Sequence, residues 1–550
     1  MKLKAVLAII AVLILSTLPV FAEEVDTSKN LTVSIWQIPD DLKYYSGYAQ
    51  NPVVAYLAEH FNLTFEYQQP PMGSEQDQFN LMLGTGEYTD FFQTSYSQES
   101  MESLYEDGVI QDLAPYLEKY MPNLYAFLQE NSEARASLYD DNGHLFVLPI
   151  INTFTDNWGG LVYRRDILDT MTGGYVSFPS GNDEPTTLED WDYMLPLMKA
   201  YFEAAGMADS ACLILPPIGY FQTGELLGGF GVGGATYIKE DGTLGFGPAE
   251  DGFYNYLVKM KEWYDLGYVY QDFASRTNDV FYLPNTALTY GGAAGIWYGL
   301  TSQLGTSMSL PEYGLNMLVN ALPAPLDTAH GVTPEEAGIH IYNGVATNSS
   351  GFAASITCSE EKLIRYLNAI DFLFTDEGSK LRVYGLDKEH GSADNAILVQ
   401  LGLQDGCWFV NGDGELEMAP VLSNDPAINI DVIRGNRLPG FTRLPLTRNC
   451  ELQDGVNVSQ VAGTVWSKYG EDNVFPTGVT LTAEESSQAS TLYTTMADYI
   501  NSMVPKFIMG TEELNEDSFN QFRSQLASFG LDEYLGIQKT AYERYLGRME

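Results

Sequence analysis

Basic residues are scarce in this sequence of 550 residues. It contains 28 Lys and Arg against 73 Asp and Glu, which gives a formal net charge of −45. Each contact with a phosphate needs a basic side chain, so this balance argues against nucleic acid or an anionic membrane as the main partner. Hydrophobic residues make up 45% and aromatic residues 13% of the chain, which excludes a disordered acidic protein and provides for a large core. The length suggests more than one domain.

Cysteine and histidine are also rare, which bears on disulfides, metals and cofactors. The cysteines lie far apart and are expected to be buried free thiols or to form one incidental bridge: Cys212, Cys358, Cys407 and Cys450. The five histidines are scattered, so no zinc site is expected. The segment 180–184 has acidic residues without the spacing of a calcium loop, and no calcium is predicted. The sequence therefore indicates neither a metal nor a cofactor.

Long apolar runs are absent except at the start of the chain. Residues 1–22 contain Lys2 and Lys4, an apolar stretch over 5–15 and a small residue, Ala22, before an acidic pair. This pattern predicts a cleaved secretory signal. The alternative, a membrane anchor, would need an apolar run of about 20 residues. Cleavage would remove two lysines and change the net charge from −45 to −47. No cysteine follows that could carry a lipid, so we expect a soluble protein outside the cell or in the periplasm.

Signatures of catalysis are missing or weak. There is no nucleophile elbow, no phosphate-binding Walker loop and no zinc-protease motif. Residues 229–234 fit the glycine pattern of dinucleotide-binding proteins, but no clear strand precedes them, and a glycine-rich loop near a ligand cleft is the better interpretation. Neighbouring carboxylates such as Asp183 and Glu184 arise by chance among 73 acids. We therefore predict no catalytic residue and no enzyme.

Hydrophobic periodicity predicts strands that alternate with helices along the chain. Strands are expected at 31–36, 63–67, 90–95, 144–149 and 161–163, and helices at 51–61, 76–83, 113–128, 188–205, 253–266, 363–374, 377–384 and 517–526. This alternation is typical of an α/β sheet with crossover connections. The sequence has no internal repeat and no low-complexity linker. Two lobes connected by several short crossings are therefore expected.

Aromatic residues near the ends of predicted elements are the most distinctive feature. Aromatic rings stack on the C–H faces of sugars, while Asp, Asn, Gln and Arg bind sugar hydroxyls. Trp191 and Trp263 lie in amphipathic helices and are expected in the core. Other aromatic residues flank glycines or strand ends and are candidates for a sugar cleft, with core packing as the alternative: Trp36, Tyr96, Trp158, Tyr220, Tyr290, Trp297 and Trp408.

The order of several segments resembles a known family. The matching segments are Gln78–Asp90, Gly108–Leu113, Leu161–Asp166, Pro185–Trp191, Leu373–Gly378 and Leu535–Tyr545. Together they resemble the extracellular solute-binding proteins of bacterial ABC transporters, family 1, the carbohydrate-binding type. The sequence departs from the family pattern at Asp387–His390, and it lacks the lipid-carrying cysteine of Gram-positive members.

The resemblance implies a two-lobed periplasmic-binding-protein fold, type II-like, with three hinge crossings and a cleft between the lobes. The crossings would fall near 150–154, 321–325 and 374–376. Lobe one would comprise 30–151 and 325–375, and lobe two 152–324 and 376–550. Ligand-binding residues would then include Trp36, Asp90, Tyr96, Asp156, Trp158, Tyr220, Tyr290, Trp297, Trp408 and Arg437.

The implied function is that of the substrate-binding subunit of an ABC importer. Such a monomeric receptor would capture a carbohydrate, in particular an oligosaccharide, by hinge closure and deliver it to the transmembrane permease subunits. Two alternatives stay open. One is a secreted carbohydrate-active enzyme, for instance a glycosidase with two cleft carboxylates. The other is a binding protein for a peptide or a uronate, in which Arg434, Arg437 and Arg443 would be the candidate partners of an acidic sugar.

Overall fold

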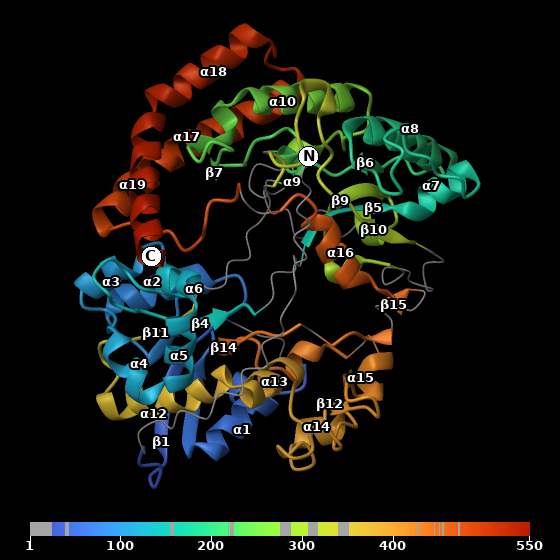
Figure 1. Ribbon diagram of the computed structural model, residues 1–550. Coiled ribbons are helices and arrows are strands. Elements are labelled where there is room, and N and C mark those ends of the chain that lie inside the picture. The colour runs from blue at the N-terminus through green and yellow to red at the C-terminus, as the bar shows by residue number, and fades with distance from the viewer. Residues whose placement is uncertain are drawn as a thin grey trace, which may run out of the picture.

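The chain folds into two α/β lobes, each built on its own sheet (Figure 1). This computed structural model describes residues 25–38, 43–153, 159–217, 219, 225–275, 288–305, 317–338, 351–425, 428–444, 446–449, 452–453, 456–470 and 473–550. The lobes have separate hydrophobic cores, one of which draws on residues between 33 and 151 and between 352 and 438. The α/β class and the two-lobed architecture predicted from the sequence are confirmed.

The sheet of lobe one is mostly parallel. Its strand order is β14 (Gly440–Phe441), β4 (Leu148–Ile151), β11 (Gly351–Ala354), β3 (Phe91–Gln93), β1 (Leu31–Trp36) and β2 (Leu63–Gln68). β2 and β3 run parallel to β1, whereas β11 is antiparallel to both β3 and β4, and β14 is parallel to β4. Every strand except β11 therefore ends at the same edge of this sheet.

That carboxyl edge of lobe one faces lobe two. The chain leaves lobe one directly after β4 to form β5 (Gly159–Arg164) in the other sheet, and again after β14. The two departing segments run side by side: the Thr442 N–H donates to the Ile151 carbonyl at 2.8 Å, and the Thr153 N–H donates to the Thr442 hydroxyl at 3.1 Å. In open α/β sheets ligands bind beyond the carboxyl ends of the strands, so a ligand site is expected at this edge.

Helices of lobe one surround its sheet. They are α1 (Pro52–His60), α2 (Glu75–Thr85), α3 (Met101–Glu106), α4 (Ala114–Tyr120), α5 (Pro122–Glu130), α6 (Ser132–Leu138), α12 (Glu360–Asp371), α13 (Asp376–Tyr384), α14 (Ala396–Gln400) and α15 (Pro420–Asn424). The single helix expected over 113–128 is two, because the break at Met121 places Pro122 at the first position of a new helix, where no N–H is needed. A hairpin of β12 (Trp408–Val410) and β13 (Leu416–Met418) completes the lobe.

Lobe two has a four-stranded sheet with helices stacked against it. The strand order is β10 (Val319–Ala321), β5, β9 (Ala294–Leu300) and β6 (Ala211–Leu213), and small hairpins join β7 (Thr236–Ile238) to β8 (Leu244–Phe246) and β15 (Leu452–Gln453) to β16 (Val456–Asn457). The helices are α7 (Arg165–Thr172), α8 (Leu188–Ala204), α9 (Glu225–Gly228), α10 (Asp251–Asp265), α16 (Val458–Trp466), α17 (Ala483–Met509), α18 (Glu516–Ser528) and α19 (Leu531–Met549). Thr187 caps α8, the helix expected over 188–205, in a capping box with Asp190.

The third crossing lies elsewhere than the sequence analysis placed it. Residues from 376 to 441 stay in lobe one instead of entering lobe two at 374–376, because β14 belongs to the first sheet and Leu381, Leu398 and Leu422 belong to the first core. The chain crosses between β14 and α16, whose Trp466 donates its indole N–H to the Leu161 carbonyl of β5 at 2.8 Å.

One buried side chain explains why this segment remains in lobe one. Arg382 of α13 is 1% exposed and donates to three backbone carbonyls: Nε to Leu438 at 2.7 Å, Nη2 to Asn436 at 2.8 Å and Nη1 to Phe441 at 3.2 Å. Its own carbonyl accepts the Gly435 N–H at 2.8 Å. Burial lowers the pKa of Arg382 to about 10. The guanidinium thus ties the whole 435–441 segment to α13.

The return to lobe one also begins later than expected. Residues 325–327 still belong to lobe two, since Leu326 exchanges backbone hydrogen bonds with Thr186 and Leu188 and the Asp327 N–H donates to Gly229 at 2.8 Å. A Cβ on Gly229 would lie 2.1 Å from the Pro325 carbonyl oxygen. The glycine-rich stretch therefore packs tightly inside lobe two, which accounts for Gly229 without a bound nucleotide.

Gly378 in α13 is the site of a stability prediction. A Cβ there would lie 2.0 Å from the Phe372 carbonyl oxygen, a backbone atom that cannot move freely. We expect Gly378→Ala to lower the free energy of unfolding by about 2 kcal/mol, although alanine normally favours helices. The matched control is Gly536→Ala in α19, where the added Cβ meets no atom within 4 Å and stability should rise by up to about 1 kcal/mol. Equal effects of the two changes in urea denaturation would contradict this interpretation.

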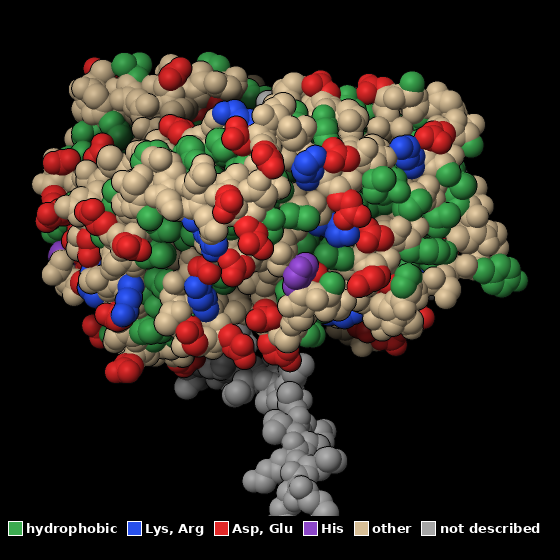
Figure 2. All heavy atoms as spheres, turned by 90° about the horizontal axis from the view of Figure 1, so that it is seen from above, with side chains coloured by type: hydrophobic (Ala, Val, Ile, Leu, Met, Phe, Trp, Pro, Cys, Tyr) green, Lys and Arg blue, Asp and Glu red, His purple; other side chains and the backbone are tan. Residues whose placement is uncertain are grey.

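Three cysteines are buried free thiols, in line with the first of the two expectations: Cys212, Cys358 and Cys407. Burial raises the pKa of each thiol to about 12. Cys450 lies outside the described residues. Among the described helices, none combines the length and the apolar character needed to cross a membrane. Acidic side chains are spread over the face seen in Figure 2 rather than gathered in one patch.

Candidate functional site

An aromatic cluster stands at the carboxyl edge of lobe one. Trp36 ends β1 and is 4% exposed; its ring centroid lies 5.3 Å from that of Phe79 in α2 and 6.5 Å from that of Tyr96, both in edge-to-face geometry. Tyr96 follows β3 and is half-buried. Phe79 and Trp36 form the base of the cluster, and Tyr96 is the member with more access to solvent.

Tyr96 lies between charges of opposite sign. Burial and the carboxylate of Glu75 raise the pKa of its hydroxyl, while the guanidinium of Arg437 acts in the other direction. Gln76 holds the backbone of this residue, donating from Nε2 to the Tyr96 carbonyl at 2.9 Å. Arg437 itself sits between Asn436 and Leu438, whose carbonyls Arg382 binds. Three of the predicted site residues, Trp36, Tyr96 and Arg437, are thus brought together from distant parts of the chain.

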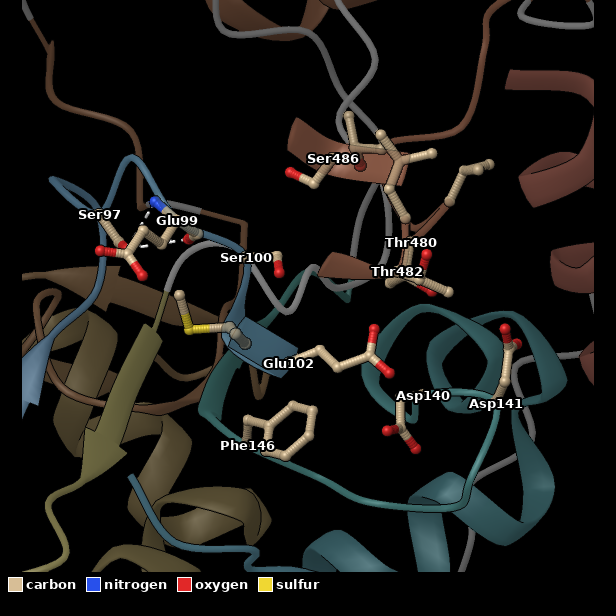
Figure 3. Close-up of a pocket in the computed structure, with 14 residues that line it drawn as sticks. Ser97, Glu99, Ser100, Glu102, Asp140, Asp141, Phe146, Thr480, Thr482 and Ser486 are labelled. Carbon is tan, nitrogen blue, oxygen red and sulfur yellow. Dashed lines mark hydrogen bonds between the residues drawn. The ribbon is translucent and has the colours of Figure 1, made fainter. Parts of the chain in front are cut away.

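A cavity of about 290 Å³ lies between the lobes, next to the loop that follows Tyr96 at the carboxyl edge of lobe one. From lobe one it is lined by the loop after Tyr96, by α3 and by residues before β4; from lobe two it is lined by the start of α17 and the segment before it (Figure 3). The lining residues are Ser97, Glu99, Ser100, Met101, Glu102, Asp140, Asp141, Phe146, Thr477, Val479, Thr480, Leu481, Thr482 and Ser486. Hydroxyls and carboxylates are suitable partners for the hydroxyls of a sugar.

Glu102 is the central acid of this cavity. Figure 3 shows its side chain extending from α3 into the space between Asp140 and the Thr480–Thr482 segment of the other lobe. Burial raises its pKa, and the nearby carboxylates, Asp140 foremost, raise it further. The backbone N–H of Ala483, at the first position of α17, donates to this carboxylate and partly offsets these effects. An acid at a helix N-terminus is favourable, since unpaired N–H groups point toward it.

Asp90, another predicted site residue, is engaged inside lobe one. It precedes β3 and lies opposite the middle of β1, where Oδ2 accepts from the Ser34 N–H at 2.8 Å and from the Ser34 hydroxyl at 2.9 Å. Lys362 of α12 reaches both carboxylate oxygens, at 3.0 and 2.8 Å. The carboxylate is 7% exposed and is thus surrounded by partners of its own lobe. This corrects the expectation that Asp90 faces the cleft.

The other described aromatic candidates lie apart from the cluster. Trp297 is 1% exposed within β9 and donates its indole N–H to Gln303 at 3.1 Å, so it belongs to the core of lobe two. Trp408 in β12 donates its indole N–H to the Gly385 carbonyl at 2.9 Å and packs on Tyr384. Tyr290 is 38% exposed on lobe two. Asp156, Trp158 and Tyr220 lie outside the described residues.

The cavity residues were not singled out in the sequence. Thr482 and Glu485 do carry a signal, since a threonine followed three residues later by a glutamate marks a helix N-terminus, and the structure has a capping box there. Nothing in that spacing reveals that lobe one meets this helix end. Within the described ranges, no three His, Cys, Asp or Glu side chains are grouped so that they could hold a metal ion. The segment 180–184, considered for calcium in the sequence analysis, lies beside Asp190 of α8. The Asp190 carboxylate accepts hydrogen bonds from the backbone N–H groups of Ser180, Thr186 and Thr187.

Comparison with protein-family models and with curated sequences finds no match. Comparison with solved structures finds many. They include the alginate-binding protein AlgQ2 without calcium ion, with 16% identity, 94% of this chain and 98% of that chain covered, and a TM-score of 0.67. An HMO-binding solute-binding protein of an ABC transporter from Bifidobacterium longum infantis has 16% identity. The likeness covers 94% of this chain and 99% of that chain, with a TM-score of 0.69.

A third structure is the ABC-transporter substrate-binding protein FusA of Streptococcus pneumoniae in complex with kestose. It has 15% identity, 94% of this chain and 99% of that chain are covered, and the TM-score is 0.67. At such identities a likeness speaks for the fold, and here it extends over almost all of both chains. The chain therefore has the two-lobed α/β fold of ABC-transporter solute-binding proteins.

Proposed function

We propose that this protein is the extracellular binding subunit of an ABC importer and that it captures a carbohydrate, in the form of an oligosaccharide, between its lobes. The observation that carries the proposal is the full-length likeness in fold to solute-binding proteins described as binding alginate, HMO or kestose. The predicted export signal and the acidic surface agree with a receptor outside the cell. The protein then binds and releases its ligand and performs no chemistry on it.

The proposed site joins the aromatic cluster to the inter-lobe cavity. The loop 94–100 connects them, because it carries Tyr96 at one end and Ser97, Glu99 and Ser100 in the cavity lining. Tyr96 would stack on one sugar ring, and hydroxyls and carboxylates from both lobes would bind sugar hydroxyls. Since some partners come from each lobe, a bound sugar favours the arrangement in which the lobes are close, and the permease subunits would read that closed form.

An acidic sugar is a second candidate ligand, favoured by one observation. Of the three arginines considered for a uronate, Arg437 lies beside the aromatic cluster. Arg434 is in an ion pair with Asp431 at 3.8 Å, and Arg443 pairs with Asp376 and donates to Ser379 at 2.7 Å. A uronate carboxylate bound near Tyr96 would therefore lie close to the guanidinium of Arg437.

The test is a thermal-shift screen of neutral oligosaccharides, uronate oligomers and peptides, followed by calorimetry on the best ligand. A ligand that binds the folded form raises the melting temperature. Tyr96→Ala should weaken the affinity by about tenfold or more, because an aromatic anchor is removed. Tyr175→Ala is the control, since that ring is 87% exposed on lobe two and should not matter. Hydrolysis of a panel oligosaccharide would favour the enzyme alternative, and unchanged affinity in Tyr96→Ala would remove Tyr96 from the site.

A further inference from the structure

Lobe two touches lobe one through the ends of two long helices. The last turns of α19 pack against α6, and the start of α17 approaches α3 (Figure 1). Tyr545 of α19 is hydrogen-bonded to Ser137 of α6. Side chains of the two lobes form this contact directly. It does not involve the segments in which the chain crosses from one lobe to the other.

The centre of the contact is a cluster of four charges, here called the Asp141 cluster: Asp141, Glu485, Arg544 and Arg548. Asp141 belongs to the turn after α6 and is the lobe-one member. Arg544 Nε lies 2.5 Å from Asp141 Oδ2, and Arg548 Nη1 pairs with Asp141 Oδ1. Arg544 also holds Glu485 of its own lobe with two contacts, at 2.8 and 2.5 Å. One aspartate thus receives two guanidinium groups from the other lobe.

Both arginines are shielded enough for these pairs to matter. The exposed fractions are 26% for Arg544, 13% for Arg548 and 32% for Asp141. Arg548 has further partners: Nε donates to the Ala136 carbonyl of lobe one at 3.1 Å and Nη2 to the Thr480 hydroxyl at 3.0 Å. The Arg544 ion pair is the main cause of the lowered pKa of Glu485. Partly buried, multiply bonded ion pairs contribute more than exposed single pairs.

The cluster stands at one end of the inter-lobe space. Asp141 and Thr480 both line the cavity described above, and so do Ser97 and Ser100, which follow Tyr96 at the carboxyl edge of the sheet. The cluster is therefore on the same side of lobe one as the aromatic cluster.

We propose that the Asp141 cluster is an electrostatic clamp that holds the lobes together around the ligand and thereby sets ligand affinity through the separation of the lobes. The part that concerns affinity rests on the proposed function. Ion pairs between the lobes that break on separation lower the free energy of the approached arrangement relative to the separated one. Because the ligand favours the same arrangement, loss of the clamp shifts the population away from the binding-competent form and raises the apparent Kd.

The test measures the separation of the lobes directly. Spin labels on Met72→Cys of lobe one and Tyr175→Cys of lobe two, in a Cys450→Ser background, report the inter-lobe distance; the replaced side chains are 83% and 87% exposed. Asp141→Asn should broaden this distribution toward longer distances and weaken glycan affinity by roughly tenfold, mainly through faster dissociation. About 0.5 M salt should shift the wild-type distances in the same direction, since it screens the ion pairs.

Matched variants separate the clamp from general effects. Arg548→Gln should reproduce Asp141→Asn, the double variant should add little, and Asp141→Glu should restore most of the affinity. Asp251→Asn removes an ion pair with Arg523 inside lobe two and should change neither readout. An unchanged distance distribution in Asp141→Asn, or tighter glycan binding, would overturn the proposal. A wild type that binds no glycan would refute the proposed function, while the ligand-free distances would still decide about the clamp.

Discussion

Replacing Arg382 by methionine is expected to lower the free energy of unfolding by about 3 kcal/mol or more. Methionine fills a similar volume but leaves the carbonyls of Asn436, Leu438 and Phe441 without their donor. Each buried polar group without a partner costs about 1–3 kcal/mol. Removal of a buried charge, which burial already disfavours, offsets part of that loss.

The change should also reach the proposed site. Once the 435–441 segment loosens, Arg437 loses its fixed position beside Tyr96, and affinity for an acidic sugar should fall in addition to stability. Chemical denaturation and calorimetry measure the two effects. Arg523→Met is the control, because Arg523 is 33% exposed and its partner Asp251 is 88% exposed; we expect a loss below about 1 kcal/mol there. Equal losses of unfolding free energy in the two variants would show that the hydrogen bonds of Arg382 do not stabilise lobe one.

Replacing Asp90 by alanine is the second change with a large expected effect, of about 2–4 kcal/mol in unfolding free energy. It leaves the ammonium of Lys362 and both Ser34 donors without their acceptor. Removing one partner of a shielded ion pair is more destabilising than replacing both. Asp90→Ala combined with Lys362→Met should therefore lose less than the sum of the single changes.

Ligand affinity distinguishes this structural role from the cleft role predicted for Asp90. If the carboxylate serves lobe one alone, the folded fraction of Asp90→Asn should bind the glycan within about twofold of wild type, in contrast to Tyr96→Ala. Strongly weakened binding with unchanged stability would instead return Asp90 to the ligand site. Calorimetry at a temperature where both proteins are folded provides the comparison.

Local patterns predicted much of the fold. The strand at 31–36 and the helix that begins after Thr187 were predicted at their observed positions, because alternating side chains and a capping residue act over a few residues. The position of the third crossing depends on contacts of Arg382 with residues more than 50 positions away, and no local pattern encodes them.

The candidate site was predicted in part for the same reason. Trp36 and Tyr96 were predicted as site residues because they lie at or after strand ends, and parallel strands bring such residues to one edge. Trp297 and Trp408 satisfied a similar rule but are held in place by Gln303 and by the Gly385 carbonyl. Burial of an aromatic ring depends on what packs over it from elsewhere in the chain. The inter-lobe cavity joins residues near 97–102 to residues near 480–486, so it is a property of the assembled lobes.

The paired exit of the chain from lobe one has a mechanical consequence. The segments after β4 and β14 leave lobe one side by side and are joined by hydrogen bonds among Ile151, Thr153 and Thr442. A single strand can bend and twist in any direction, whereas two hydrogen-bonded strands form a ribbon that bends easily across its flat face and resists twisting. We expect this two-stranded ribbon to act as a hinge that restricts the lobes to opening and closing about one axis. Their facing surfaces would then meet in the same alignment each time.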